Sequence, residues 1–551
     1  MNLRGAFFLI SNYIKQIEEP AVVVGSGLAG IIAAIKLSKK NKEVAVITKK
    51  GPGKATCTSF SMGIFTSAGG SEFDEEDHYE KSFDAGEGVN QQDILKQMVE
   101  GSPKAFEFLS KELGIELNNT ERGFQVRKGK RPIPGSNLMD ELTAIAKNLG
   151  VRFYSFHLPV EIIKDGDECQ GILALDDENN LVYFKSKTVL LATGGFAGSF
   201  KKNDNPPAMR GEGLMLAYRA GARLKDLEFI QFYPIGFRDK RLPGFIAPIF
   251  YPKSAKLVND EGEDLLKKHL GEGWNVNTAC LSERDKLGRK LEEEWQSGSR
   301  AWMDMTSCPE EEWEGLNSLS LYETISFDFD KEPFLVGPLA HFTMGGIALD
   351  EELETGVKGL YAAGEVVGGI HGANRLGGNA LTEALTFGVK CALKMEKRLT
   401  DEKEPKDVEL SKIEYQNPLI KILNKNLSES DNESLSAKED SNDNVKIVDR
   451  KLKDVHWEAL SPIREKVTME KGLKEGEKIR DEILNLCKLA GEGKVRKKDL
   501  KSLVTCEMSS NLFQLTVQSA LQRKESRGSH YRKDYPNKDD DNFTKSFYHL
   551  E

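Results

Sequence analysis

A strand, a glycine turn and a helix follow one another near the beginning of the chain. Residues 21–24 form an apolar run that is typical of a buried parallel strand. Gly25, Gly27 and Gly30 follow with the G-x-G-x-x-G spacing, and residues 31–37 continue with a helical pattern. In such a turn the first glycine makes the bend, the second lets the backbone reach a pyrophosphate and the third lets helix meet strand. The segment therefore predicts the start of a dinucleotide-binding Rossmann fold.

The next predicted strand, residues 43–47, indicates which nucleotide fits. An ordinary nicotinamide site has an acidic residue at the end of this strand, where it binds ribose hydroxyl groups. This chain instead has Thr48, Lys49 and Lys50. The sequence therefore disfavours a nicotinamide dinucleotide at this site.

A second glycine-rich segment, residues 371–379, lies more than three hundred positions further along, shortly after a turn at residues 362–366. It places the guanidinium of Arg375 among glycines that let the backbone come close to a ligand. A guanidinium can bind a carboxylate through two parallel hydrogen bonds. Residues 188–195 add an apolar strand ending in Thr-Gly-Gly, which predicts another close approach of backbone to cofactor. Together these segments predict a flat cofactor beside an acid-binding arginine.

Composition disfavours several other classes of protein. The 551 residues allow three or four domains, and the net charge of -10 disfavours nucleic-acid binding. The seven cysteines are scattered without a C-x-x-C pair, so neither a zinc site nor an iron–sulfur cluster has its ligand spacing. The apolar run at residues 6–10 is too short for a signal sequence or a membrane span. We expect a cytoplasmic chain with reduced thiols that is not integral to a membrane.

Helical patterns occur in several parts of the chain, at residues 91–113, 137–149, 214–220 and 451–525. A less regular region from about 233 to 335 interrupts the nucleotide fold. Residues 427–444 contain almost no apolar side chains, so burial cannot offset the entropy of ordering them. We interpret this polar segment as a disordered loop before a separate helical bundle.

The chain resembles the flavoprotein subunits of fumarate reductase and succinate dehydrogenase, with L-aspartate oxidase as a close relative. The resemblance runs from about residue 21 to the C-terminal tail and rests on short motifs in the family order. These motifs are residues 25–30, 192–195, 231–234, 284–286, 341–346, 363–366, 371–379 and 523–530. The resemblance implies an α/β fold class, with a Rossmann-type FAD-binding domain interrupted by a capping domain and followed by a C-terminal helical domain.

Transferred to this chain, that organisation gives five segments. The FAD-binding domain would comprise residues 1–232 and 336–400, with the capping domain at 233–335 between its two parts. Residues 401–450 would be a polar, partly disordered insertion, and residues 451–551 the C-terminal helical domain and tail.

The resemblance also implies which residues bind FAD. On the family pattern Thr48 and Lys49 are normal for FAD, and Glu365 would hold ribityl or ribose hydroxyl groups. The full implied set is Gly25, Gly27, Leu28, Ala29, Gly30, Thr48, Lys49, Thr58, Ser59, Gly63, Ala192, Thr193, Gly194, Glu365, Arg375, Ala380 and Leu381.

The flavin linkage departs from part of the family. The membrane-complex members attach FAD through a histidine in a His-Thr segment, whereas residues 55–59 of this chain read Ala-Thr-Cys-Thr-Ser. We therefore expect non-covalent FAD and no metal site. Cys57 is interpreted as a small buried or hydrogen-bonding thiol.

Catalytic roles follow from the same resemblance. In the family, hydride passes between flavin N5 and one alkene carbon, while an arginine delivers a proton to the other. By motif, Arg284 would be the proton donor, Arg375 and His341 would bind a substrate carboxylate, and Tyr233 would replace a substrate-binding histidine. Drawing electron density toward the carboxylate makes the alkene a better hydride acceptor. The implied function is interconversion of an unsaturated carboxylic acid and its saturated form. An arginine is a weak acid, so Arg284 needs a proton relay.

Other departures leave the substrate open. The family's Thr-Glu pair and Arg-Gly-Glu-Gly run are missing near residues 247–254, where Tyr251 and Lys253 could build a different pocket or only pack under the cap. A different enoic acid or its thioester therefore rivals fumarate. An L-aspartate oxidase-like flavin oxidase and a non-catalytic FAD-binding scaffold are further alternatives. Retained Arg284, His341 and Arg375 count against the scaffold.

Electron supply predicts a partner. The chain has no haem-attachment motif and no cluster ligands, so it needs another protein or oxygen to exchange electrons. The charged tail at residues 523–536 resembles the part of the dehydrogenase subunits near their iron–sulfur partner. We expect an iron–sulfur electron-transfer subunit, with peripheral attachment to the cytoplasmic membrane face through partners as one arrangement.

Overall fold

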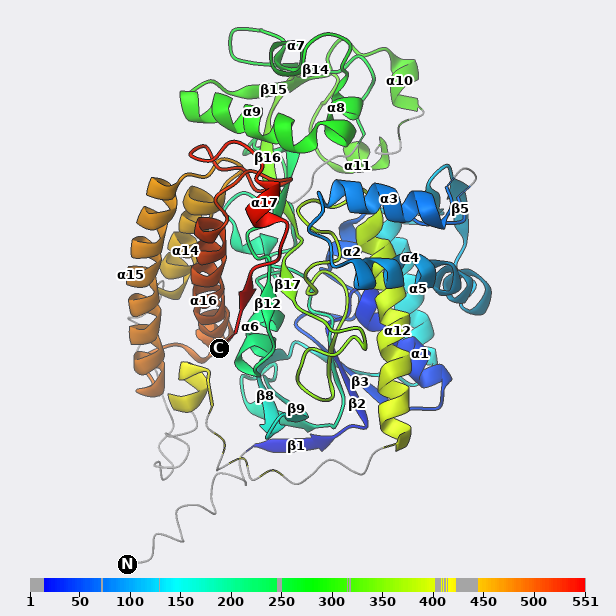
Figure 1. Ribbon diagram of the computed structural model, residues 1–551, viewed down its shortest axis with the longest axis vertical. Helices are drawn as coiled ribbons and strands as arrows, with labels where there is room; N and C mark the ends of the chain where they lie inside the picture. The colour runs from blue at the N-terminus through cyan, green and yellow to red at the C-terminus, as the bar shows by residue number, and fades with distance from the viewer. Residues whose placement is uncertain are drawn as a thin grey trace, which may run out of the picture.

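A parallel sheet forms the centre of the computed structural model, which describes residues 14–70, 73–127, 129–244, 250–314, 316, 319–401, 408, 410, 413, 415–422 and 444–550 (Figure 1). Its strands lie in the order β18, β11, β2, β3, β7, and every neighbouring pair is parallel. The bounds are β2 (Ala21–Val24), β3 (Val44–Thr48), β7 (Arg152–Ser155), β11 (Val189–Leu191) and β18 (Leu360–Ala362). All residues of β2, β3, β11 and β18 are buried, as the apolar runs predict.

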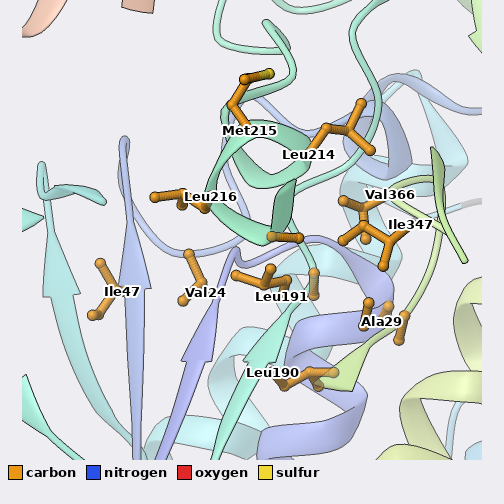
Figure 2. Packing of buried hydrophobic residues seen from close by; sticks show 14 of the residues in the cluster. Val24, Ala29, Ile47, Leu190, Leu191, Leu214, Met215, Leu216, Ile347 and Val366 are labelled. Atoms are coloured by element: carbon orange, nitrogen blue, oxygen red, sulfur yellow. The ribbon is translucent and has the colours of Figure 1, made fainter. Parts of the chain in front are cut away.

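Helices cover the sheet and bring distant segments onto it. Helix α1 (Leu28–Lys39) begins at the glycine turn and packs against α12 (Asn379–Asp401). Figure 2 shows apolar side chains from β2, β3, β11 and α6 (Glu212–Arg219) in one cluster. Gly30 is required where α1 crosses β2, because a Cβ atom there would lie 2.1 Å from the carbonyl oxygen of Gly25.

Smaller elements complete this domain. One four-stranded sheet has the order β1, β10, β9, β8, and two three-stranded sheets have the orders β4, β6, β5 and β17, β12, β19. The strand bounds are β1 (Lys15–Glu18), β4 (Ile64–Thr66), β5 (Leu117–Thr120), β6 (Gly123–Val126), β8 (Leu158–Asp165), β9 (Glu168–Leu175), β10 (Leu181–Lys185), β12 (Leu224–Lys225), β17 (Gly346–Ile347) and β19 (Tyr548–His549). The remaining helices are α2 (Cys57–Phe60), α3 (Glu75–Ala85), α4 (Gln92–Glu107), the π-helical turn Phe108–Glu112, α5 (Pro134–Asn148) and the 3₁₀ turn Ala197–Ser199.

A second unit, the cap, stands over one end of the parallel sheet (Figure 1). Two long antiparallel strands, β13 and β16, lead into and out of it, and its apolar core is separate from the main core. Its elements are β13 (Ile230–Phe237), β14 (Lys256–Val258), β15 (Ala301–Asp304), β16 (Phe334–Thr343), α7 (Leu265–Leu270), α8 (Val276–Ser282), α9 (Arg284–Ser297), α10 (Glu310–Glu314) and α11 (Leu319–Thr324). The irregular sequence between 233 and 335 therefore folds around its own core.

Three long helices form the C-terminal part, and they share the main apolar core with the FAD-binding part. They are α14 (Asn444–Leu460), α15 (Lys466–Gly491) and α16 (Leu500–Gln522), followed by α17 (Asp540–Phe543); the 3₁₀ turn Lys497–Asp499 precedes α16. Helix α14 begins at Asn444, so the end of the predicted 401–450 insertion is helical. Val445 and Val448 are buried there, and this burial stabilises the start of the helix. Residues 423–443, including most of the predicted polar loop, lie outside the described residues. Among the described helices, none combines the length and apolar character needed to cross a bilayer.

Buried arginines fasten the C-terminal tail to the rest of the fold. Arg523 is fully buried and contacts Glu228 at 2.5 Å and Glu525 at 3.1 Å. It also donates to the carbonyl oxygens of Phe543 and Lys545. The charges of this part of the tail are therefore satisfied within the chain. The tail charge that the sequence associates with a partner surface is largely internal.

Replacing Arg523 with methionine should destabilise the protein strongly, because Glu228 would remain buried without the guanidinium that lies 2.5 Å from its carboxylate. Losing one partner of a buried pair costs about 3–5 kcal/mol. We expect the midpoint of thermal unfolding to fall by several degrees in Arg523→Met. The neighbouring Lys524 is exposed, so Lys524→Met is the matched control. Equal midpoints for the two variants would contradict the proposed fastening.

Candidate functional site

A cavity of about 1160 Å³ lies between the end of the parallel sheet and the cap. Its lining comes from the turns after β2, β3, β11 and β18, from the segment around Arg375, and from α8, α9 and α11 of the cap. The carboxyl ends of neighbouring parallel strands meet at one edge of a sheet, where α/β folds bind their ligands. The cavity therefore joins the predicted nucleotide turn to the predicted acid-binding residues.

The glycine turn after β2 has the shape of a pyrophosphate cradle. Gly25 has φ 111°, and a Cβ atom on it would lie 2.1 Å from the carbonyl oxygen of Ala192. At Gly27 a Cβ would meet nothing closer than 3.9 Å, so the backbone there faces open space. Gly27, the N-cap residue of α1, has no side chain that could cap the helix, and Thr58 Oγ1 accepts from the backbone N–H of Leu28 at 3.3 Å. The N-terminus of α1 faces the cavity, because Gly27, Leu28 and Ala29 line it. This cradle fits the phosphates of a dinucleotide such as FAD.

Lys49 directly follows β3 and forms an ion pair with Glu212. Lys49 Nζ lies 2.8 Å from Glu212 Oε1, and Ser26 Oγ and Thr48 Oγ1 lie 3.0 Å apart. Burial alone would raise the pKa of Glu212, but the attraction of Lys49 outweighs it and places this pKa below its ordinary value. Thr48 and Lys49 both line the cavity, where they could contact the nucleoside end of FAD.

Glu365 is a half-buried acid that lines the cavity. Its Oε1 accepts hydrogen bonds from the backbone N–H of Thr343 at 3.1 Å and from the hydroxyl of Thr343 at 3.3 Å. Burial raises the pKa of Glu365 to about 7, although Thr343 and Arg375 act in the opposite direction. Near neutral pH, Glu365 can therefore exchange between a proton donor and an acceptor for a ligand hydroxyl group.

Arg375 is the most deeply buried cation of the cavity. Its Nη2 donates to Gln231 Oε1 at 2.9 Å, and its guanidinium lies 4.4 Å from the ring centre of Phe342. Its buried Nε has no partner among the described residues. Burial lowers the pKa of Arg375 to about 9, and repulsion by Arg284 adds to the shift. A bound carboxylate would relieve both effects, because it would hydrogen-bond the guanidinium and supply negative charge.

Arg284 approaches the same cavity from the cap. It is the first residue of α9, and its Nε donates to the carbonyl oxygen of Cys280 at 3.3 Å. The next residue, Asp285, accepts from Asn374 Nδ2 at 2.6 Å and so ties the cap to the segment that holds Arg375. Burial raises the pKa of Asp285 above its ordinary value. The two arginines therefore face one cavity from different domains.

His341 and Tyr233 lie side by side on the two strands that enter the cap. His341 Nδ1 lies 2.7 Å from Asp204 Oδ2, and the rings of His341 and Tyr233 are 6.0 Å apart between centres. The contact with Asp204 fixes the histidine ring and leaves Nε2 as its free end. Burial raises the pKa of Tyr233 well above its ordinary value, so its phenol is neutral.

Cys57 lies at the cavity as a hydrogen-bonded thiol. Its Sγ donates to Asn205 Oδ1 at 3.2 Å. Burial raises the pKa of the Cys57 thiol well above its ordinary value, and Glu365 and Asp204 raise it further. The thiolate, which is the nucleophilic form, is therefore disfavoured. All seven cysteines of the chain are free thiols.

The structure brings most of the predicted site residues to the cavity, including the four catalytic candidates Arg284, His341, Arg375 and Tyr233. The cofactor candidates that line it are Gly25, Gly27, Leu28, Ala29, Thr48, Lys49, Thr58, Ala192, Thr193, Gly194, Glu365, Arg375, Ala380 and Leu381.

Three predicted cofactor residues do not line the cavity. Gly30 packs against the Gly25 carbonyl, which is the helix-to-strand role expected of the third glycine. Ser59 completes the capping box of α2 with Thr56. Gly63 has φ 66° and lies against Val126. These positions shape the backbone around the cavity.

Several polar residues of the cavity have no role that sequence patterns alone assign. Gln231, Asp285 and Asn374 lie within the family motifs, and the hydrogen bonds that join them to one another or to Arg375 reveal their role. Asp204 and Asn205 lie in a polar loop after the 3₁₀ turn, where no pattern marks them. Their partners are more than one hundred residues away along the chain, so only the fold identifies them.

Residues 247–254, where the family's Thr-Glu pair and Arg-Gly-Glu-Gly run are missing, lie only partly within the described residues. Tyr251 is buried in the cap, where its hydroxyl donates to the carbonyl oxygen of Ile235 at 2.9 Å, and Lys253 is exposed. Neither lines the cavity, whereas Phe250 does. Residues 245–249 lie outside the described residues. Tyr251 therefore packs within the cap, and Lys253 does not contribute to a pocket.

The raised pKa of Glu365 predicts a pH-dependent stability. Its pKa is about 7 in the folded apoprotein and 4.5 ordinarily, so folding is penalised above pH 7 and the penalty disappears as pH falls toward 4.5. We expect Glu365→Gln to raise the apoprotein's unfolding midpoint relative to the unmodified chain at pH 8, with a smaller gain at pH 5.5. Thermal unfolding across this range measures the difference. Glu100→Gln, on the exposed surface of α4, should show no such trend.

Comparison with known proteins places this geometry in a family. A family model described as "FAD binding domain" matches residues 21–381, and one described as "Fumarate reductase flavoprotein C-term" matches residues 449–549. Relatives include an uncharacterized FAD-dependent oxidoreductase of Methanocaldococcus jannaschii, 29% identical, covering 94% of this chain and 93% of the relative. A fumarate reductase (CoM/CoB) subunit of Methanothermobacter marburgensis is 27% identical with 94% and 95% coverage. L-aspartate oxidase of Saccharolobus solfataricus is 28% identical with 94% and 96% coverage.

Solved structures show the same fold. A chain of E. coli quinol fumarate reductase matches with a TM-score of 0.80 and 23% identity, covering 98% of this chain and 95% of that one. Mycobacterium smegmatis Sdh1 matches with a TM-score of 0.75 and 24% identity, at 96% and 90% coverage. These matches confirm the predicted fold class, and the family models confirm the FAD cofactor. The chain therefore belongs to the FAD-binding flavoprotein family of fumarate reductase, succinate dehydrogenase and L-aspartate oxidase, and it is an FAD-dependent oxidoreductase.

Proposed function

We propose that the protein interconverts an unsaturated carboxylic acid and its saturated form. The observation that supports this most directly is the pair of guanidinium groups, Arg375 from the FAD-binding domain and Arg284 from the cap, in one cavity. Burial and Arg284 both disfavour the charged form of Arg375. Two cations held close together in a site between two domains favour an anionic ligand.

The arginines would act on the substrate in two ways. Arg375 is pinned by Gln231 at 2.9 Å, so it can bind a carboxylate with little loss of side-chain freedom. Its charge also draws electron density from a double bond conjugated with that carboxylate, which makes the alkene a better hydride acceptor. When bound, FAD supplies two-electron hydride chemistry.

Residues that reach the cavity from the cap would deliver the proton to the substrate. Arg284 reaches the cavity from the start of α9, and His341 is held by Asp204 with its Nε2 end free to contact the substrate. Because an arginine is a weak acid, Arg284 would work as a relay that is reprotonated, rather than as a simple acid. The Asp285 to Asn374 contact at 2.6 Å would keep the cap closed over the reacting atoms and exclude water.

Arg375→Gln should slow reoxidation of the reduced enzyme by its enoic acid substrate by about a hundredfold or more, because the carboxylate would lose a charge-assisted bidentate contact. Anaerobic stopped-flow spectroscopy of the flavin gives this rate. Arg300→Gln, at an exposed ion pair with Asp260 in the cap, is the control. The flavin content of each purified variant must be measured first, because Arg375 also lies near the cofactor site. Unchanged reoxidation by Arg375→Gln would refute the carboxylate role.

Oxidation of an amino acid is the second candidate, because an L-aspartate oxidase and the methanogen fumarate reductase subunit are similar to this chain to nearly the same degree, at 28% and 27% identity. The two functions differ in the compounds that react with the flavin, which are L-aspartate and oxygen for the oxidase and an enoic acid for the reductase. We expect no hydrogen peroxide above background when the enzyme is mixed with L-aspartate in air, and fast anaerobic reoxidation by an enoic acid. Rapid peroxide production with aspartate would favour the oxidase.

We also propose that an iron–sulfur protein exchanges electrons with this chain. Three relatives are named as subunits, which supports a multi-subunit assembly. The internal pairing of Arg523 leaves the exposed residues of the tail, such as Lys533 and Lys538, as candidates for the contact. Affinity purification under anaerobic conditions should return a second protein with stoichiometric iron. A purified chain that turns over with oxygen at full rate and without iron would argue against this partner.

A further inference from the structure

The cap contributes an apolar arm to the cavity. Leu281 at the end of α8, Leu321 on α11 and Phe250 all line it. Leu281 is 65% exposed, which is unusual for a leucine next to a catalytic site, whereas Leu321 is buried and Phe250 is half-buried. An exposed leucine on a cavity wall gains free energy when an apolar group of a ligand covers it.

This arm shares the cavity with Arg284 and Arg375. Leu281 follows Cys280, whose carbonyl oxygen accepts from Arg284 at 3.3 Å. Tyr322, which follows Leu321, donates from its hydroxyl to the carbonyl oxygen of Phe250 at 3.2 Å. Cys280 also interacts electrostatically with both Tyr322 and Tyr233. The three apolar residues and Arg284 all line the cavity from the cap.

The arm offers little to a second carboxylate. Tyr233 borders it with a neutral phenol, and Ser282 and the acidic Glu283 are the polar neighbours of Leu281. Lys286 and Arg289 of α9 also line the cavity, and the guanidinium of Arg289 lies 4.8 Å from the ring centre of Tyr531 in the C-terminal tail. A dicarboxylate with one carboxylate on Arg375 and the other in the arm would place that second charge against apolar carbon and near Glu283, where desolvation is unfavourable.

We propose that the substrate is a 2-enoic monocarboxylic acid whose far end is an apolar chain of several carbons. This inference rests on the proposed function and narrows it. The carboxylate binds Arg375, and the chain packs against Leu281, Leu321 and Phe250. In the reducing direction the double bond is consumed, the β-carbon gains a hydride from reduced flavin, and the α-carbon gains a proton. The acid thereby takes up two electrons and two protons, and the flavin is oxidised.

The test is a chain-length series with the reduced holoenzyme in the absence of oxygen. Fumarate, trans-2-butenoate, trans-2-hexenoate and trans-2-octenoate are mixed with it in turn, and flavin reoxidation gives a second-order rate constant for each. Two additional buried methylene groups should raise this constant about tenfold from butenoate to hexenoate. Hexenoate should also exceed fumarate.

A matched pair of variants assigns the effect to the arm. Leu281→Asn should lower the ratio of the hexenoate to the butenoate constant about threefold or more. Leu393 is 44% exposed on α12 and does not line the cavity, so Leu393→Asn should leave the ratio unchanged. Because both leucines are exposed, neither substitution removes core packing.

The possible failures are separable. Fumarate reacting faster than hexenoate, or rate constants that do not depend on chain length, would overturn the apolar-chain inference and leave the enoic acid function standing. An unchanged ratio in Leu281→Asn would overturn the role of the arm. No reoxidation by any of the acids would overturn the proposed function itself. Reoxidation only by the hexenoyl thioester, at a rate unaffected by Arg375→Gln, would overturn both, because no carboxylate would then be bound.

Discussion

The close approach of two strand ends determines the rest of the site. A Cβ atom on Gly25 would lie 2.1 Å from the carbonyl oxygen of Ala192, so β2 and β11 can end together only with glycine at this position. β18 ends beside them, since Ala363 N donates to the carbonyl oxygen of Leu191 at 3.0 Å. Three turns from distant parts of the chain thus meet at one edge of the sheet. The cradle for FAD and the position of Glu365 both follow from this meeting.

The charged groups of the site are arranged so that a bound acid would supply a counter-charge to Arg375. Burial lowers the pKa of Arg375 to about 9 and raises that of Glu365 to about 7, so each charged form is held at a cost. On the proposed function, an anion on Arg375 would offset the desolvation of the guanidinium and its repulsion from Arg284. Binding energy would then be concentrated where the carboxylate is conjugated with the reacting carbons, which is where it lowers the barrier.

Local patterns predicted the nucleotide half of the fold well, because spacing over about twenty residues encodes β2, α1 and β3. The cap could not be predicted in the same way, since its entry and exit strands pair residues more than one hundred positions apart, such as Ile230 with Thr343. The C-terminal tail could not be predicted from local patterns for the same reason. Arg523 resembles surface charge in the sequence, but its partner Glu228 lies 295 residues away and both are buried. Site residues within motifs were found, whereas Asp204 depended on the fold.

The division of the site between two cores separates anchoring from selectivity. Arg375 and Glu365 belong to the FAD-binding domain, whereas Leu281, Leu321 and Phe250 belong to the cap, whose apolar core is distinct. A substitution in the cap can therefore change what the far end of the substrate meets without moving the cradle or the carboxylate anchor. Relatives of nearly equal identity, 27% and 28%, are named for different reactions. On the proposed function, the cap surface that faces the cavity would be the part of the site in which such a difference in substrate arises.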